Sequence, residues 1–320
     1  MNFCTTEVVS RVVDVDGIPM SGLLCEVPEP RAVVVALHGG AVTSSYFDYP
    51  DQPRLSLLRT AAALGFTVVA IDRPGYGSSA PHSETMASPA RRVDLAYAAV
   101  ERLLGTRPRG AGLFLWAHSI GCALGVHMAG DERRNDLLGL EIAGTGRHHA
   151  PGAVEILDFR RRDPAVPRRS GPGLRDLLWE PSCLYPDEVV GAPRIQSAGP
   201  PYESTVARRW PLEFPEAAAR VRIPVHYTLG DHERVWSSGP EAMADIASLF
   251  TDSPRVVTDE QADSGHNLSV GHTATGYHLK ILSFVEECVL ASENGGYDNG
   301  GYDNDGYDND GIDRLPRRAG

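Results

Sequence analysis

The chain has 320 residues, five of them cysteine, and a formal net charge of −12. This length fits one large domain or two modest ones, and such a core needs no disulfide or metal to fold. The acidic net charge argues against nucleic acid as the main partner, and no apolar run reaches the ~20 residues that span a membrane. The scattered cysteines and the start MNFCTTE favour a cytoplasmic protein with reduced thiols.

The body of the chain alternates short apolar runs with helical patterns. Residues 7–14 and 21–27 predict an opening hairpin. Continuous apolar runs predict strands that are buried on both faces, at 32–37, 67–71, 112–116, 137–142 and 224–229, and a further strand at 255–258. Helical patterns fall at 55–64, 89–104, 120–129, 239–249 and 272–291. The alternation predicts an α/β protein with a doubly wound, mostly parallel sheet.

Two segments depart from this body. Residues 145–222 hold 11 of the 24 prolines and carry a charge of +2, which indicates an inserted module. Residues 292–320 repeat Gly-Tyr-Asp-Asn, carry −4 and have few aliphatic side chains, so they predict a disordered acidic tail. The remaining residues, 1–144 and 223–291, carry −10 and are predicted to form the core.

The segment from Ala117 to Gly121 follows the strand predicted at 112–116 and comes before a helix. Small residues two positions on either side of Ser119 suit the tight turn of a nucleophile elbow. The start of the helix would favour negative charge on the serine oxygen. The same pattern also fits a serine that caps an ordinary helix.

The glycine-rich turn His38-Gly39-Gly40 follows the strand predicted at 32–37. Glycine lets backbone N–H groups come close to a ligand. The N–H groups of Gly40 and Ile120 are therefore candidates for an oxyanion hole.

Candidate acids and a candidate base follow the last two strands. Asp231 and Glu233 come directly after the strand at 224–229, and His266 lies in the polar loop Asp263–Asn267. The order of nucleophile, acid and histidine is that of a known Ser…Asp/Glu…His triad. In such a triad His266 would take the proton of Ser119, and the acid would orient the imidazole.

Together with the segment Asp72–Ser78 (DRPGYGS), these motifs resemble those of the α/β-hydrolase family. The resemblance covers roughly residues 7–291, apart from much of the segment 145–222. It implies the α/β-hydrolase fold with a helical cap inserted between the sixth and seventh strands, where residues 145–222 fall. It favours Glu233 over Asp231, since family members often place the acid three residues after the glycine that ends this strand.

The resemblance implies a serine hydrolase that cleaves an ester or thioester through an acyl-enzyme, with no cofactor and no metal. The expected substrate is a small organic or polyketide-like molecule, free or linked to a carrier. An alternative is a lyase that eliminates a carboxylate such as acetate, or an acyltransferase, with the same residues in natural-product biosynthesis. Arginine supplies 29 of the 30 basic residues, which indicates the coding bias of a GC-rich genome and is compatible with such a pathway in an actinomycete. A third class is a binding protein that has kept the fold.

A cap would exclude water and shape the substrate pocket. The candidate substrate contacts are His38 and three aromatic residues of the cap: Trp179, Tyr202 and Trp210. Arginine clusters in the cap predict either a solvated face or a site for an anionic or carrier-linked substrate; they lie at 160–162, 168–169 and 208–209. The pair His148-His149 has no further ligand at metal spacing, so we predict no metal site.

Overall fold

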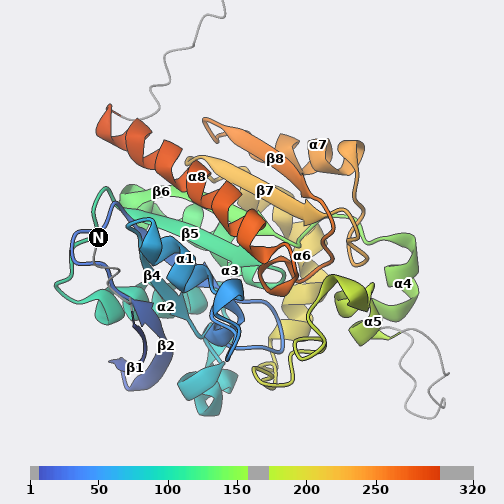
Figure 1. Ribbon diagram of the computed structural model, residues 1–320, viewed down its shortest axis with the longest axis horizontal. Helices are drawn as coiled ribbons and strands as arrows, with labels where there is room; N and C mark the ends of the chain where they lie inside the picture. The colour runs from blue at the N-terminus through green and yellow to red at the C-terminus, as the bar shows by residue number, and fades with distance from the viewer. Residues whose placement is uncertain (1–6, 158–172, 296–320) are drawn as a thin grey trace, which may run out of the picture.

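The computed structural model describes residues 7–157 and 173–295. Eight strands form one sheet in the order β1-β2-β4-β3-β5-β6-β7-β8 (Figure 1). The β1–β2 hairpin is antiparallel, β2 pairs with β4 in the same way, and every other pairing is parallel. The strands are β1 (Val8–Val15), β2 (Ile18–Cys25), β3 (Val33–Leu37), β4 (Thr67–Ile71), β5 (Leu113–His118), β6 (Leu137–Ala143), β7 (Val225–Gly230) and β8 (Val256–Gln261).

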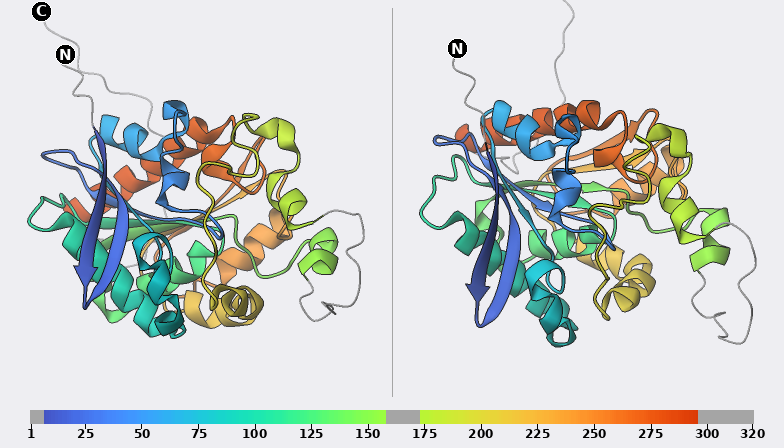
Figure 2. Two further views of the ribbon diagram at one scale, coloured as in Figure 1. Left: turned by 90° about the horizontal axis from the view of Figure 1, so that it is seen from below. Right: turned by 60° about the horizontal axis from the view of Figure 1, so that its bottom comes forward.

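Helices cover both faces of the sheet (Figure 2). One face carries α1 (Leu57–Ala63) and α8 (Ala274–Glu293). The other carries α2 (Pro89–Leu104), α3 (Gly121–Ala129), α6 (Glu203–Ala218) and α7 (Pro240–Ser248). Strand β3 shows why both faces must be covered: Val33, Val35 and Leu37 enter one core, and Val34 and Ala36 enter the other.

The parallel register brings the carboxyl ends of the central strands to one edge. Leu37 of β3 lies opposite Ile71 of β4 and Ala117 of β5, so the segments that follow these strands emerge together. In sheets of this kind, ligands bind at that edge. The register thus decides where the polar loops of this chain meet.

The predicted fold class is confirmed, and the predicted helix at 89–104 matches α2 at both ends. Helices α4 (Pro151–Leu157), α5 (Leu174–Trp179) and α6 occupy the segment between β6 and β7. In Figure 2, α4 and α5 lie on the side of the molecule away from the β1–β2 hairpin. Helix α8 extends to Glu293, so the predicted boundary of the tail at 292 falls inside a helix; residues 296–320 lie outside the described part of the chain.

Among residues 7–157 and 173–295, no helix combines the length and the apolar character that crossing a membrane requires.

His278 of α8 is a buried polar group that the fold leaves unsatisfied. Its side chain is fully buried against the ring of Trp116, with the ring centroids 5.9 Å apart. Neither ring nitrogen has a hydrogen-bond partner among the described residues. Burial lowers the pKa of His278 from 6.5 to about 3, because the charged form loses its hydration. The folded protein therefore holds this imidazole neutral at pH values where the unfolded chain protonates it.

This difference predicts a specific loss of stability in acid. The free energy of unfolding should fall as the pH drops from 6.5 toward 3, by about 1.4 kcal/mol per pH unit for this one proton, since the unfolded state binds it more tightly. His278→Leu should remove that component and hold or raise the stability at pH 7, because it also removes a buried unpaired polar group.

Urea denaturation of the wild type and His278→Leu between pH 7.5 and 4.5 measures the difference. His148→Leu is the matched control, since the side chain of His148 is 66% exposed. A wild-type pH slope in His278→Leu would contradict the assignment.

Candidate active site

Ser119 lies at the turn between β5 and α3. Its φ of 53° is in the left-handed region, which residues other than glycine rarely adopt. The Ser119 N–H donates to the carbonyl of Ala143 at 2.8 Å. A Cβ added at Gly121 would lie 2.4 Å from the carbonyl oxygen of His38, so α3 approaches β3 too closely for any side chain there. The small residue that the sequence pattern singled out is required by this contact.

The loops after β7 and β8 bring an acid and an imidazole to this serine. His266 Nε2 lies 2.9 Å from Ser119 Oγ, and His266 Nδ1 lies 2.9 Å and 3.1 Å from the two carboxylate oxygens of Glu233. The backbone N–H groups of Arg234 and Val235 donate to Glu233 Oε1 at 3.0 Å and 2.7 Å, which fixes the carboxylate. His266 and Glu233 are both buried. The structure therefore connects Ser119, His266 and Glu233 in one chain of polar contacts.

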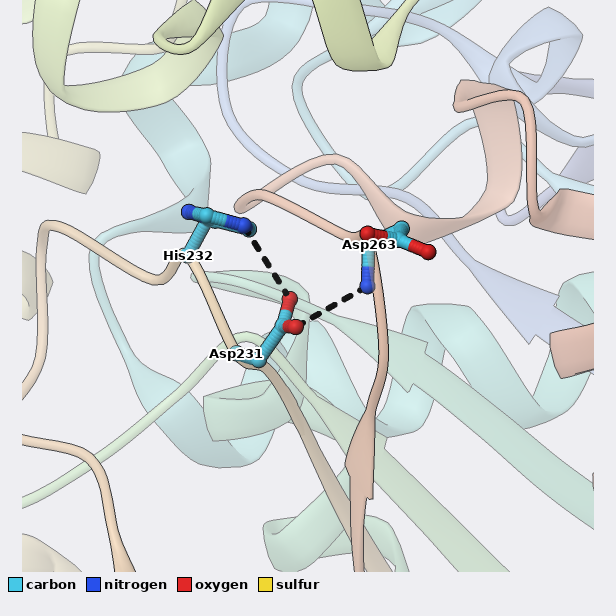
Figure 3. A group of neighbouring side chains, drawn as sticks. All are labelled: Asp231, His232 and Asp263. Carbon is cyan, nitrogen blue, oxygen red and sulfur yellow. Dashed lines mark hydrogen bonds and ion pairs between the residues drawn. The ribbon is translucent and has the colours of Figure 1, made fainter.

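Asp231, the other candidate acid, does not contact His266. Its carboxylate accepts the N–H of Asp263 at 3.0 Å and the N–H of Ser264 at 2.9 Å, as Figure 3 shows in part. His232 Nε2 lies 3.9 Å from the same carboxylate, and Asp231, His232 and Asp263 are all exposed. Asp231 thus holds the loop that leads to His266, and we assign no metal to this group.

His118 holds the same loop from the other side. Its Nε2 lies 2.9 Å from the carbonyl oxygen of His266, and its ring stacks on Tyr46 with the centroids 4.6 Å apart. Burial lowers the pKa of His118 to about 3, so the imidazole is neutral and can donate to the carbonyl through a single N–H. The backbone of His266 is therefore fixed before its side chain reaches Ser119.

Two backbone N–H groups beside Ser119 are available as donors. Among the described residues, neither Gly40 N–H nor Ile120 N–H has a hydrogen-bond acceptor. A Cβ added at Gly39 would lie 3.2 Å from the Cβ of Ser119, and one added at Gly40 would lie 3.4 Å from the side chain of Ile120. The glycine-rich turn therefore packs directly against the Ser119 turn, as an oxyanion hole requires.

A cavity of about 230 Å³ opens beside Ser119 and His266. Leu157, Leu174, Leu178, Glu203, Ala207 and Trp210, from the segment between β6 and β7, form much of its wall. Thr145 and His149 of the same segment add polar groups, and the core adds Val42, Val235, Trp236 and Asn267. Glu203 is the one carboxylate, and no arginine or lysine is found, among the described lining residues.

Of the substrate contacts that the sequence suggested, only Trp210 lines this cavity. Trp179 lines a neighbouring groove of about 360 Å³, which shares Leu178 with the cavity. His38 and Tyr202 face elsewhere: His38 Nε2 accepts the N–H of Arg73 at 3.0 Å, and the Tyr202 hydroxyl donates to the carbonyl of Pro74. The polar groups of both side chains form hydrogen bonds to main-chain atoms. The expectation that His38 and Tyr202 contact the substrate is therefore corrected.

The predicted arginine clusters do not form the cavity wall where the structure describes them. Arg208 and Arg209 are exposed on α6, and Arg209 pairs with Glu213 at 2.6 Å. The clusters at 160–162 and 168–169 lie outside the described residues.

Sequence reasoning missed Trp236, His149 and Glu203. The first two stack on each other with ring centroids 4.4 Å apart, at the cavity wall. Trp236 follows Glu233 by three residues, so its proximity to the acid was a usable signal. Glu203 is separated from Ser119 by 84 positions and carries no motif.

A family model described as "Alpha/beta hydrolase family" matches residues 34–274. A stretch of 74 residues is 40% identical to Protein ABHD14A of Danio rerio; it covers 23% of this chain and 25% of that protein, about a quarter of its length. A thermostable carboxyl esterase from Bacillus coagulans is similar in structure, with a TM-score of 0.63, 17% identity, and coverage of 88% of this chain and 99% of that one. The thioesterase domain of the curacin biosynthetic pathway gives a TM-score of 0.56 at 17% identity, with coverage of 88% and 99%. At these identities the two structures show a shared fold.

The close approach at Gly121 predicts a large effect of one methyl group. Gly121→Ala should lower the free energy of unfolding by about 2 kcal/mol or more, because the new Cβ would overlap the His38 carbonyl. Gly276→Ala in α8 is the matched control: a Cβ there meets no atom within 4 Å, so stability should rise by about 0.5–1 kcal/mol. Urea denaturation measures both, and equal stabilities of Gly121→Ala and the wild type would refute the packing argument.

Proposed function

The chain belongs to the alpha/beta hydrolase family, and we propose that it is a serine-dependent hydrolase that cleaves an ester or thioester through an acyl-enzyme. The observation that carries the proposal is the 2.9 Å contact between Ser119 Oγ and His266 Nε2, with Glu233 at the other ring nitrogen. A neutral serine hydroxyl is a weak nucleophile, and this arrangement supplies the base that activates it.

In the acylation step, Ser119 Oγ attacks the carbonyl carbon while His266 Nε2 takes the hydroxyl proton. Glu233 accepts the Nδ1–H of His266, which selects the tautomer with a free lone pair on Nε2. The same carboxylate stabilises the imidazolium that forms. His266 then gives the proton to the leaving alcohol or thiol, and the acyl group stays on Ser119.

Negative charge develops on the carbonyl oxygen during this step. The N–H groups of Gly40 and Ile120 are the donors that would receive it, and both lie beside Ser119. The amino end of α3 adds a favourable dipole at the same place. In the second step a water molecule loses a proton to His266, attacks the acyl carbon and releases the acid.

The cavity supports an uncharged, largely apolar acyl group on a small organic substrate. Most of its apolar side chains are leucine, valine and tryptophan, and its one carboxylate among the described residues is paired with Arg73. An anionic acyl group would meet no free cation on the described wall. We propose that residues 145–222 act as the cap that shapes this cavity and limits the access of water.

Hydrolysis through Ser119 should place one oxygen atom from water in the acid that is released. With a neutral p-nitrophenyl ester in ¹⁸O-labelled water, the wild type should release an acid with one ¹⁸O, and Ser119→Ala should release essentially none. Ser248→Ala is the matched control, because Ser248 is exposed on α7 and its hydroxyl donates to the carbonyl of Asp245. Mass spectrometry of the product decides. Release of p-nitrophenol without labelled acid would indicate transfer of the acyl group to an acceptor other than water, and would reject the proposal.

The two acids should differ sharply in their effect on turnover. Glu233→Gln should lower kcat/KM by about 10³- to 10⁴-fold, because the amide favours the wrong imidazole tautomer. Asp231→Asn should lower it by less than about tenfold, since this residue holds only backbone N–H groups of a neighbouring loop. Steady-state kinetics of both variants provides the measurement. The opposite ranking would assign the acid to Asp231.

A further inference from the structure

The loop that carries Gly40 contains a residue in an unfavourable backbone conformation. Ala41 has a φ of 59°, a left-handed value that non-glycine residues rarely adopt without support from their surroundings. The Ala41 N–H donates to the hydroxyl of Tyr76 at 3.0 Å. This hydrogen bond is one of the contacts that hold the loop in place.

Glu203 of α6 stands behind that hydrogen bond. The Tyr76 hydroxyl donates to Glu203 Oε2 at 2.5 Å. Arg73 Nη2 donates to Glu203 Oε1 at 2.6 Å and to the carbonyl of Gly39 at 2.8 Å. One carboxylate therefore orients two side chains, and each of them holds a backbone group of the loop on either side of Gly40.

The ion pair between Arg73 and Glu203 is shielded from solvent, so its geometry is well defined. The Arg73 side chain is 3% exposed and that of Glu203 is 15% exposed. Burial raises the pKa of the Tyr76 hydroxyl above its usual range, which keeps its proton in place as the donor to Glu203. With that proton committed, the oxygen of Tyr76 is free to accept from Ala41.

The segment between β6 and β7 also holds the loop from its other side. The Ser197 N–H donates to the carbonyl of Ala41 at 2.9 Å, and Val42 forms an isolated bridge with Gln196. A Cβ added at Gly40 would lie 3.2 Å from Glu203 Oε2, so the carboxylate lies directly against the residue whose N–H is the candidate donor.

We propose that Glu203 is a positioning residue for the oxyanion hole, acting through Tyr76 and Arg73 on the loop Gly39–Ala41. The inference rests on the proposed function, since it needs Gly40 to receive the developing charge. Ala207 and Trp210 of the same helix line the substrate cavity. Through Glu203, the helix that contacts the acyl group is also the helix that sets the geometry of the donor.

Two variants and a matched control test the proposal. Tyr76→Phe removes the hydroxyl link and leaves the buried Arg73–Glu203 pair intact. Glu203→Gln removes the charge. Glu213→Gln makes the same chemical change on α6 at a residue that pairs with Arg209 instead. For each variant we would measure kcat and KM with a p-nitrophenyl ester, the pH profile, and the rate at which a fluorophosphonate labels Ser119.

We expect Tyr76→Phe and Glu203→Gln to lower kcat by about 10- to 100-fold with KM within about threefold, as a displaced oxyanion donor would. The labelling rate should fall in parallel, because the phosphoryl oxygen of the probe occupies the same hole when Ser119 displaces fluoride. The pH profile should stay unchanged, since His266 is not affected. Glu213→Gln should match the wild type in every measurement.

The proposal is overturned if Tyr76→Phe keeps a wild-type kcat, if the losses appear in KM alone, or if the pH profile shifts. Thermal denaturation checks that each variant is folded, and if Glu203→Gln does not fold, Tyr76→Phe alone decides. A wild-type protein that the fluorophosphonate does not label contradicts the proposed function itself. That result is distinct from a labelled wild type with unaffected variants.

Discussion

The sharp turn at Ser119 is the constraint on which the rest of the site depends. Helix α3 lies so close to β3 that no side chain fits at Gly121, and Ser119 at the same turn has a left-handed backbone conformation. The conformation is unfavourable for a serine, so packing on both sides has to maintain it. In return, the hydroxyl stands at the edge of the sheet, where the parallel register also delivers the loops after β3, β7 and β8.

The polar groups around that turn are fixed mainly through backbone. Asp231 and His118 each bond to main-chain atoms of the loop that carries His266, and Glu233 is fixed by two N–H groups of its own loop. The imidazole therefore reaches Ser119 with little freedom left to lose. Such preorganisation lowers the entropic cost of reaching a reactive geometry, which is a large part of enzymatic rate enhancement.

The net charge of the segment between β6 and β7 does not match the character of the cavity wall that it forms. The segment carries a charge of +2 beside a core of −10, and its arginine clusters predicted either a solvated face or a site for an anionic substrate. Its described cavity wall is apolar instead, and the carboxylate of Glu203 is paired with the core residue Arg73. The exposed arginines of α6 face solvent, where charge contributes little to recognition of a buried group. Net charge of a segment is thus a poor guide to the chemistry of the surface it buries.

The sequence by itself determined the fold class, the order of the strands and of the helices outside residues 145–222, and the serine, histidine and glycine turns. These depend on short-range patterns: buried strands appear as apolar runs, and tight turns require small residues. It favoured Glu233 over Asp231 only by resemblance, since two carboxylates two positions apart look alike until the direction of each side chain is known. Only the tertiary structure showed that Glu233 faces His266 and Asp231 faces a backbone loop. The same holds for Glu203, for Trp236, and for the exclusion of His38 and Tyr202 from the cavity. Their contacts join residues far apart along the chain, and no periodicity or spacing in the sequence indicates which of these residues the fold brings together.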